Sequence, residues 1–291
     1  MHPEMITRFY TIAGLRICVE IPEGERDAGD GMLQGFCGEG PHWDYHMSCC
    51  LRETLSAPVG TCVFHEVQCQ AFREEDRTVT YLGRVDENLD HADTRISRQG
   101  NQIQVEFLRR TPQTRIHPRM VAGAMDLPHL LTVHDGFLLH ASFIEYQGQA
   151  ILFTAPSETG KSTQAQLWCD HAGAELVNGD RAAVRVMDGK VYACGIPFSG
   201  SSPVRRNVTL PLAAIVCLSQ APENTIHPLR GVRAFRRVWE GCTLNVWDRI
   251  DMERAAQTVS DVIAGVPVYH LACTPDVRAV ELLKQTLEVD T

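Results

Sequence analysis

The segment TAPSETGKST, residues 154–163, is the most informative stretch of the chain. It ends in Gly160-Lys161-Ser162-Thr163, as phosphate-binding loops do. An apolar strand pattern, QAILFTA, precedes it, and a helical pattern, KSTQAQLWCDHA, follows it. A helix that starts directly after such a loop points unpaired backbone N–H groups and the positive end of its dipole at an anion. The sequence therefore predicts a nucleotide-phosphate site in this loop.

Two residues depart from the usual composition of such a loop. Ala155 stands where a first glycine is common, and Glu158 places a carboxylate inside the loop. A carboxylate close to a triphosphate is unfavourable by Coulomb's law unless it points to solvent or meets a cation. We therefore expect Glu158 to face solvent or the acceptor side of the site. A degenerate loop that binds no nucleotide is the alternative interpretation.

Residues outside the loop supply further chemistry. Lys161, one of three lysines in the chain, would bring positive charge to the β- and γ-phosphates, and the Ser162 hydroxyl would bind Mg²⁺. Asp180 follows a short strand pattern, ELVN, where a carboxylate can hold the same ion or act as a base; a turn aspartate paired with Arg181 is the alternative. His140 lies in the strand pattern before the loop strand and would reach the phosphates, unless it is a core histidine.

The patterns divide the chain into two parts. Residues 1–116 carry short segments of β-branched and aromatic residues in partial alternation, which predicts a β-rich N-terminal subdomain of unassigned role. Residues 117–291 alternate strand and helix patterns, which predicts an α/β layer architecture.

Local composition predicts individual boundaries in the second part. Pro128 should break the helical pattern of residues 118–136. Gln147-Gly148 should form a tight turn between two strands, and Thr274 should cap the last helix.

Composition argues against several function classes. The net charge of the 291 residues is −9, whereas nucleic-acid-binding proteins usually carry a basic surplus, so we expect no nucleic-acid partner. No run approaches the ~18 apolar residues of a membrane helix, and the first residues lack a signal-peptide pattern. We therefore expect a cytoplasmic protein without a membrane partner. The eleven cysteines favour reduced thiols, with a zinc site from Cys37, His42, His46 and Cys49 as the alternative.

A longer stretch carries a family resemblance. LLHASFIEYQGQAILFTAPSETGKSTQAQLW, with the later AELVNGDRAAV, resembles the catalytic core of the HPr kinase/phosphorylase and phosphoenolpyruvate carboxykinase superfamily, and is most similar to the HPr-kinase-related proteins. In HPr kinases a histidine opens the strand before the P-loop strand, as His140 does here. A short strand then ends in an acidic pair followed by arginine, and here that place reads Gly179-Asp180-Arg181, so one acid is missing. The resemblance spans residues 127–287 and implies an α/β fold with an HPr-kinase/PEP-carboxykinase-like P-loop core in residues 117–291.

The resemblance also implies a set of site residues. Positive charge near the phosphates would come from the segment GSSPVRRNVTLPLAAIVCL, although a solvated basic turn is the alternative. The implied catalytic residues are His140, Lys161, Asp180, Arg205 and Arg206. The implied metal ligands are Ser162 and Asp180. The implied nucleotide-binding residues are Ala155, Pro156, Ser157, Glu158, Thr159, Gly160, Lys161, Ser162 and Thr163.

The predicted function is therefore ATP-dependent, Mg²⁺-assisted phosphoryl transfer to a hydroxyl on a peptide, a protein or a small molecule. ATP and Mg²⁺ are the implied cofactors, and a homo-oligomer is expected because such relatives are often oligomers. Two alternatives stay open. One is a non-catalytic, nucleotide-binding regulatory module, favoured by Glu158 and the missing acid. The other is a carboxykinase-like enzyme acting on a small molecule.

Overall fold

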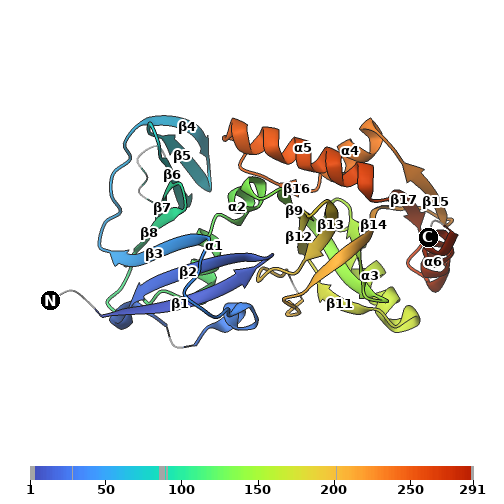
Figure 1. Ribbon diagram of the computed structural model, residues 1–291, viewed down its shortest axis with the longest axis horizontal. Helices are drawn as coiled ribbons and strands as arrows, with labels where there is room; N and C mark the ends of the chain where they lie inside the picture. The colour runs from blue at the N-terminus through green and yellow to red at the C-terminus, as the bar shows by residue number, and fades with distance from the viewer. Residues whose placement is uncertain (1–3, 28, 85–88, 90, 201, 290–291) are drawn as a thin grey trace. The chain divides into compact units, whose positions relative to one another are not determined.

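A computed structural model describes residues 4–27, 29–84, 89, 91–200 and 202–289 (Figure 1). The chain divides into two compact units, Met1–Asp126 and Leu127–Thr291. The sequence patterns place the boundary earlier, between residues 116 and 117. The difference is helix α1 (Pro118–Ala124), which contacts the short helix η2 (Gly31–Phe36) and so clusters with the first unit.

The first unit is built on one large sheet. Within the described residues the sheet has eight strands in the order β1-β2-β3-β8-β7-β6-β5-β4, mostly antiparallel, with parallel pairing of β2 with β3 and of β3 with β8. The strands are β1 (Met5–Ile12), β2 (Leu15–Pro22), β3 (Tyr45–Arg52), β4 (Thr61–Glu66), β5 (Cys69–Arg73), β6 (Thr78–Gly83), β7 (Ala92–Gln99) and β8 (Gln102–Leu108), with a short helix η1 (Glu23–Glu25) after β2.

The second unit combines nine described strands with five helices over its described part. Its strands are β9 (Gly136–Tyr146), β10 (Gln149–Thr154), β11 (Glu175–Asn178), β12 (Arg181–Met187), β13 (Lys190–Cys194), β14 (Thr209–Gln220), β15 (Thr225–Leu229), β16 (Cys242–Thr243) and β17 (Val268–Cys273). Its helices are α2 (Leu127–Val133), α3 (Lys161–Ala172), α4 (Val232–Trp239), α5 (Arg249–Gly265) and α6 (Val277–Val289). The chain is thus a mixed α/β protein with large sheets, as the sequence predicts at that level.

Two long strands organise the second unit, because each pairs with different partners along its length. The first half of β9 pairs with β12 and the second half with β10, and the change falls between His140 and Ala141. Strand β14 pairs with β13 at its start and then runs parallel to β10. The ends of β10 and β14 therefore lie beside the point where β9 changes partner.

Helices cover both faces of the sheet that contains β10 and β14 (Figure 1). On one face, Ala234 and Val238 of α4 and Val259 and Val262 of α5 are buried against sheet residues. On the other face, Trp168 of α3 and side chains of α6 join a second core cluster. Among the described residues, no helix is long and apolar enough to cross a membrane.

Two of the three predicted boundaries in this unit are confirmed. The helical pattern breaks between α1 and α2, where Asp126 has a φ of 52°, just before Pro128. Gln147 and Gly148 both have positive φ and join β9 to β10 in a tight turn. The expected cap Thr274 is wrong by two residues, because Asp276 Oδ1 accepts the Arg278 N–H (3.0 Å) at the start of α6.

Candidate functional site

The loop between β10 and α3 has a backbone that its sequence explains. Gly160, which directly precedes α3, has a φ of 114°, a value that a residue with a Cβ rarely adopts. Glu158 has a φ of 63°, so a non-glycine residue occupies the left-handed region at a cost of about 1–2 kcal/mol. Its carbonyl oxygen accepts a hydrogen bond from the Gln220 side chain at the end of β14 (3.4 Å). The loop is therefore held in one conformation by its glycine and by the neighbouring strand.

The first turn of α3 is open to an anion. In the described chain no side chain caps this helix, and its first turn holds no acidic residue. Ser162 and Thr163 are exposed at this end. The unpaired N–H groups of a first helical turn carry a partial positive charge, so they attract a phosphate.

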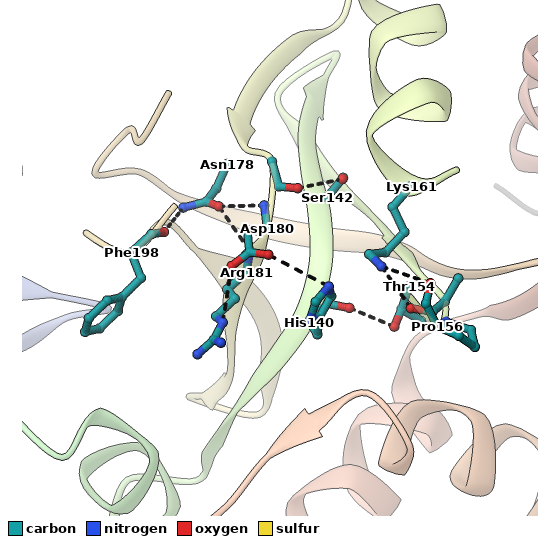
Figure 2. A network of polar contacts seen from close by, with 11 residues as sticks. His140, Ser142, Thr154, Pro156, Lys161, Asn178, Asp180, Arg181 and Phe198 are labelled. Atoms are coloured by element: carbon teal, nitrogen blue, oxygen red, sulfur yellow. Dashed lines mark hydrogen bonds and ion pairs between the residues drawn. The ribbon is translucent and has the colours of Figure 1, made fainter. Parts of the chain in front are cut away.

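Lys161 is buried although it is charged. Lys161 is only 7% exposed. Its Nζ donates to the carbonyl oxygens of Ala155 (3.0 Å) and Pro156 (3.2 Å). Figure 2 shows this side chain turned towards the loop. Burial lowers the pKa of Lys161, and the nearby carboxylate of Asp180 acts in the opposite direction. Over the described part of the chain, the hydrogen-bond partners of this cation are thus two carbonyl oxygens of the loop and no carboxylate.

Asp180 is positioned by its neighbours in the turn between β11 and β12 (Figure 2). The backbone N–H groups of Asp180 and Arg181 both donate to Asn178 Oδ1 (2.9 and 3.0 Å), and the fully buried Asn178 is fixed by the carbonyl oxygens of two residues of the following loop. Gly200 lies against the Asp180 side chain, where an added Cβ would come within 3.2 Å. The turn therefore presents one carboxylate in a defined place.

His140 and Asp180 come together across the β9–β12 pairing. His140 Nε2 lies 3.8 Å from Asp180 Oδ1, and Arg181 Nε lies 3.3 Å from Asp180 Oδ2. The His140 backbone oxygen also accepts the Thr154 hydroxyl at the end of the loop strand (2.9 Å). Burial lowers the pKa of His140, and the positive charges of Lys161 and Arg181 lower it further against the opposing effect of Asp180. The lowered pKa favours the neutral imidazole, which is the form that can accept a proton.

The two predicted arginines have different surroundings. Arg206 lies 2.9 Å from both Glu145 and Glu175, so its charge is already paired by two carboxylates. Glu145 is five residues along β9 from His140, so the two side chains point to opposite faces of the strand. The structure does not bring Arg206 to the loop. Arg205 forms a backbone bridge with Asn178, which places it beside the Asp180 turn.

Two cavities flank the loop. We call the first the α4 cavity: it has a volume of about 430 Å³ and lies between the start of the loop and the end of α4. Its lining includes His140, Ser157, Cys217, Arg237, Glu240 and Gly241. We call the second the α3 cavity: it has a volume of about 600 Å³ and lies between the end of the loop, α3 and the ends of β14 and β17. Its lining includes Glu158, Gly160, Thr163, Gln164, Gln220 and Pro275.

The sequence patterns did not predict helix α4, whose end forms one wall of the α4 cavity. Arg237, Glu240 and Gly241 lie in the segment VRAFRRVWEG, for which we predicted no element. A signal was present, because Ala234 and Val238 are spaced four apart, as on the buried face of a helix, and both are buried.

The zinc alternative in the first unit finds no support in the described residues, where no group of three His, Cys, Asp or Glu side chains is placed to hold a metal. His46 instead contacts Glu20 (3.1 Å), and Cys49 is buried in the sheet.

The fold and site define a mixed α/β protein whose second unit joins a lysine-bearing loop to a helix. The chain belongs to the family described as SynChlorMet cassette protein ScmC, because the model of that family matches residues 105–287, well over half of the chain.

No curated protein matches the chain, whereas a number of solved structures do. The structure of the Hpr(Ser) kinase/phosphatase from Coxiella burnetii is 12% identical, with a match that covers 53% of this chain and 99% of that chain at a TM-score of 0.32. This is a weak structural relation.

Proposed function

We propose that the chain catalyses ATP-dependent, Mg²⁺-assisted transfer of a phosphoryl group to a hydroxyl acceptor. The observation that carries this proposal is the buried Lys161, which follows the left-handed Gly160 and precedes an uncapped helical turn. Burying an ammonium group is costly unless it is bound by oxygens. Two loop carbonyls bind it here, and a phosphate would complete its coordination.

The loop residues fit the phosphates of a nucleotide. Backbone N–H groups at the start of α3 would bind phosphate oxygens, and Lys161 would neutralise the β- and γ-phosphates. Ser162 and Asp180 are the residues that would hold Mg²⁺, which would neutralise further charge on the β- and γ-phosphate oxygens. The α3 cavity, which Thr163 and Gln164 line beyond the loop, would take the nucleoside.

His140 would take the proton of the acceptor hydroxyl. The acceptor hydroxyl must lose its proton as its oxygen bonds to phosphorus, and a base within hydrogen-bond reach accelerates this step. The missing second acid leaves Gly179 before Asp180. His140, whose lowered pKa favours the neutral imidazole, lies 3.8 Å from Asp180 and would accept that proton while Asp180 serves the metal. Arg205, which lies beside the Asp180 turn, would supply positive charge that stabilises the negative charge spread over the transition state.

A second candidate function is a nucleotide-binding regulatory module without transferase activity. The single acid at Asp180 favours it, because metal binding and proton removal would otherwise share one carboxylate.

The test is isothermal titration of the full chain with ATP, ADP and GTP, with and without Mg²⁺, followed by an assay of ATP turnover. We expect ATP to bind more tightly with Mg²⁺, and slow ATP hydrolysis to occur without an acceptor. Binding without any turnover would favour the regulatory module. No binding of any nucleotide would overturn the proposed function.

A further inference from the structure

The α4 cavity presents one cation that the proposed function leaves unused. Arg237, in the last turn of α4, lines this cavity together with His140 of β9 and Ser157 of the loop. Among the described lining residues it is the one lysine or arginine. Its position therefore places a permanent positive charge beside the start of the loop, whereas the α3 cavity is lined by the end of the loop.

The guanidinium of Arg237 has donors to spare. Arg237 Nη1 is 3.9 Å from Glu240 Oε2, a loose ion pair, whereas Arg236 Nε is only 2.9 Å from Glu240 Oε1. Glu240 is thus already bound by Arg236, which points to solvent with a side chain 79% exposed. A guanidinium carries five N–H donors, and a phosphoryl group accepts them in pairs.

The backbone that carries Arg237 is fixed to the residues around the loop. The Gly241 oxygen accepts the His140 N–H (2.8 Å), and Cys242 pairs with Leu139 of β9. A Cβ at Gly241 would come within 2.7 Å of the Thr154 hydroxyl, so the turn after α4 packs directly on the end of the loop strand. The end of α4 is consequently held in a fixed position relative to the loop. A charge stabilises a transition state best when its position is fixed in this way beforehand.

Glu240 also lines this cavity and is paired with Arg236, and the two thiols of the lining carry no charge, so Arg237 remains as the anion-binding group. Burial raises the pKa of Cys217 to about 12 and that of Cys242 to about 12, so both thiols are uncharged at neutral pH.

We propose that Arg237 binds the terminal phosphoryl group of the nucleotide from the α4 side of the loop. The inference rests on the proposed function and deepens it, because it assigns the α4 cavity to the reacting phosphate and its acceptor. It also replaces Arg206, which is paired with Glu145 and Glu175, as the arginine that meets the transferred charge.

The test compares two nucleotides that differ only in the terminal group. Mg-ADP and the Mg complex of the β,γ-imido analogue of ATP are titrated into the wild type, Arg237→Ala and Arg236→Ala. We expect Arg237→Ala to bind the imido analogue at least tenfold more weakly, about 1.4 kcal/mol, and to bind ADP unchanged. Arg236→Ala is the matched control, because it removes an adjacent arginine that also contacts Glu240, and it should bind both nucleotides as the wild type does.

Three results separate the outcomes. An equal loss for ADP and the imido analogue, or no loss for either, overturns the role of Arg237 while leaving the proposed function intact. A wild type that binds neither nucleotide overturns the proposed function and this role together. Arg237→Lys, which keeps the charge but not the planar fork, should recover part of the affinity for the imido analogue, and thermal unfolding without nucleotide should confirm that all variants fold.

Discussion

The two cavities beside the loop differ in the side chains they offer. The α4 cavity has a histidine, an arginine and a glutamate in its lining, whereas the α3 cavity is lined by hydroxyls, amides, apolar side chains and the carboxylate of Glu158. Phosphoryl transfer needs bases and cations at one end of the nucleotide and little chemistry at the other. Under the proposed function, the contrast predicts a direction for the nucleotide, with the reacting phosphate towards α4 and the nucleoside towards α3.

The largest expected effect tests the reacting end. Asp180→Asn keeps the shape of the side chain but removes the charge that would bind Mg²⁺ under the proposed function. We expect ATP turnover to fall by about 100-fold or more, since ligands and bases of this kind contribute that much. The fall should appear at saturating nucleotide, because the loop itself is unchanged.

Asp170→Asn is the control for the change in net charge. Asp170 is exposed on α3 and accepts a hydrogen bond from Gln166 four residues earlier. Its loss should leave turnover unchanged. Turnover like that of the wild type in Asp180→Asn would instead assign this carboxylate to a structural pair with Arg181, from which it lies 3.3 Å.

The next largest effect tests Lys161, in the loop that both cavities adjoin. Lys161→Ala should weaken Mg-ATP binding at least tenfold, about 1.4 kcal/mol, because it removes the cation nearest the phosphates. Lys161 is buried and bound to two loop carbonyls, so the variant should also lose some stability without nucleotide.

Lys161→Met and Lys190→Ala separate these contributions. Lys161→Met keeps most of the buried stem and should bind ATP as weakly as the alanine variant while losing less stability. Lys190 is exposed at the start of β13, so Lys190→Ala removes the same charge without touching the loop. Unchanged ATP affinity in both Lys161 variants would contradict the nucleotide assignment.

The loop and its flanking elements were predictable because their signals are local. Gly160 needs a positive φ, Gln147-Gly148 suits a tight turn, and the apolar run of β10 is continuous. Strands β3 and β7 lack such a local signal, because YHMSCCLR and ADTRISRQ carry few β-branched residues and several polar ones.

The surroundings of the arginines were not predictable, since they depend on contacts between distant segments. Arg206 finds Glu145 and Glu175 through strand pairing that no sequence spacing reveals. Arg237 reaches the α4 cavity only because Cys242 pairs with Leu139. Residue types near a loop suggest chemistry, but tertiary packing decides which of several arginines remains available.

A smaller effect concerns pH, and it should be confined to the α4 side. The pKa of His140 is lowered in the folded state by burial and by nearby positive charges. Below about 6.5, the unfolded chain binds a proton that the folded chain resists, so the free energy of unfolding should fall as the pH drops. Burial, Arg237 and His227 also lower the pKa of His270, so part of this decline has a second source.

His140→Gln tests the share of the first histidine. Its free energy of unfolding should decline less steeply between pH 7.5 and 5.5 than that of the wild type, as measured by denaturant titration. Equal slopes for the two proteins would show that His140 takes up its proton as readily when folded as when unfolded.

The smallest expected effect concerns Glu158, the residue that departs most from a phosphate loop. Its side chain is exposed and lines the α3 cavity, and it does not line the α4 cavity. A carboxylate about 4 Å from a phosphate oxygen would cost about 4 kcal/mol at an effective dielectric constant near 20, whereas an exposed one is largely screened by solvent. We therefore expect Glu158→Gln to change ATP affinity by less than about threefold, with the difference shrinking further as salt is added.

Glu158→Gly separates charge from backbone strain, because the residue has a φ of 63° that glycine adopts without cost. It should raise the free energy of unfolding by about 1 kcal/mol relative to Glu158→Gln while giving the same ATP affinity. Affinities of both variants are measured at equal Mg²⁺ and salt. A gain of a hundredfold or more in either variant would mean that this carboxylate blocks the phosphates, and the regulatory module without transferase activity would then be the better account of the site.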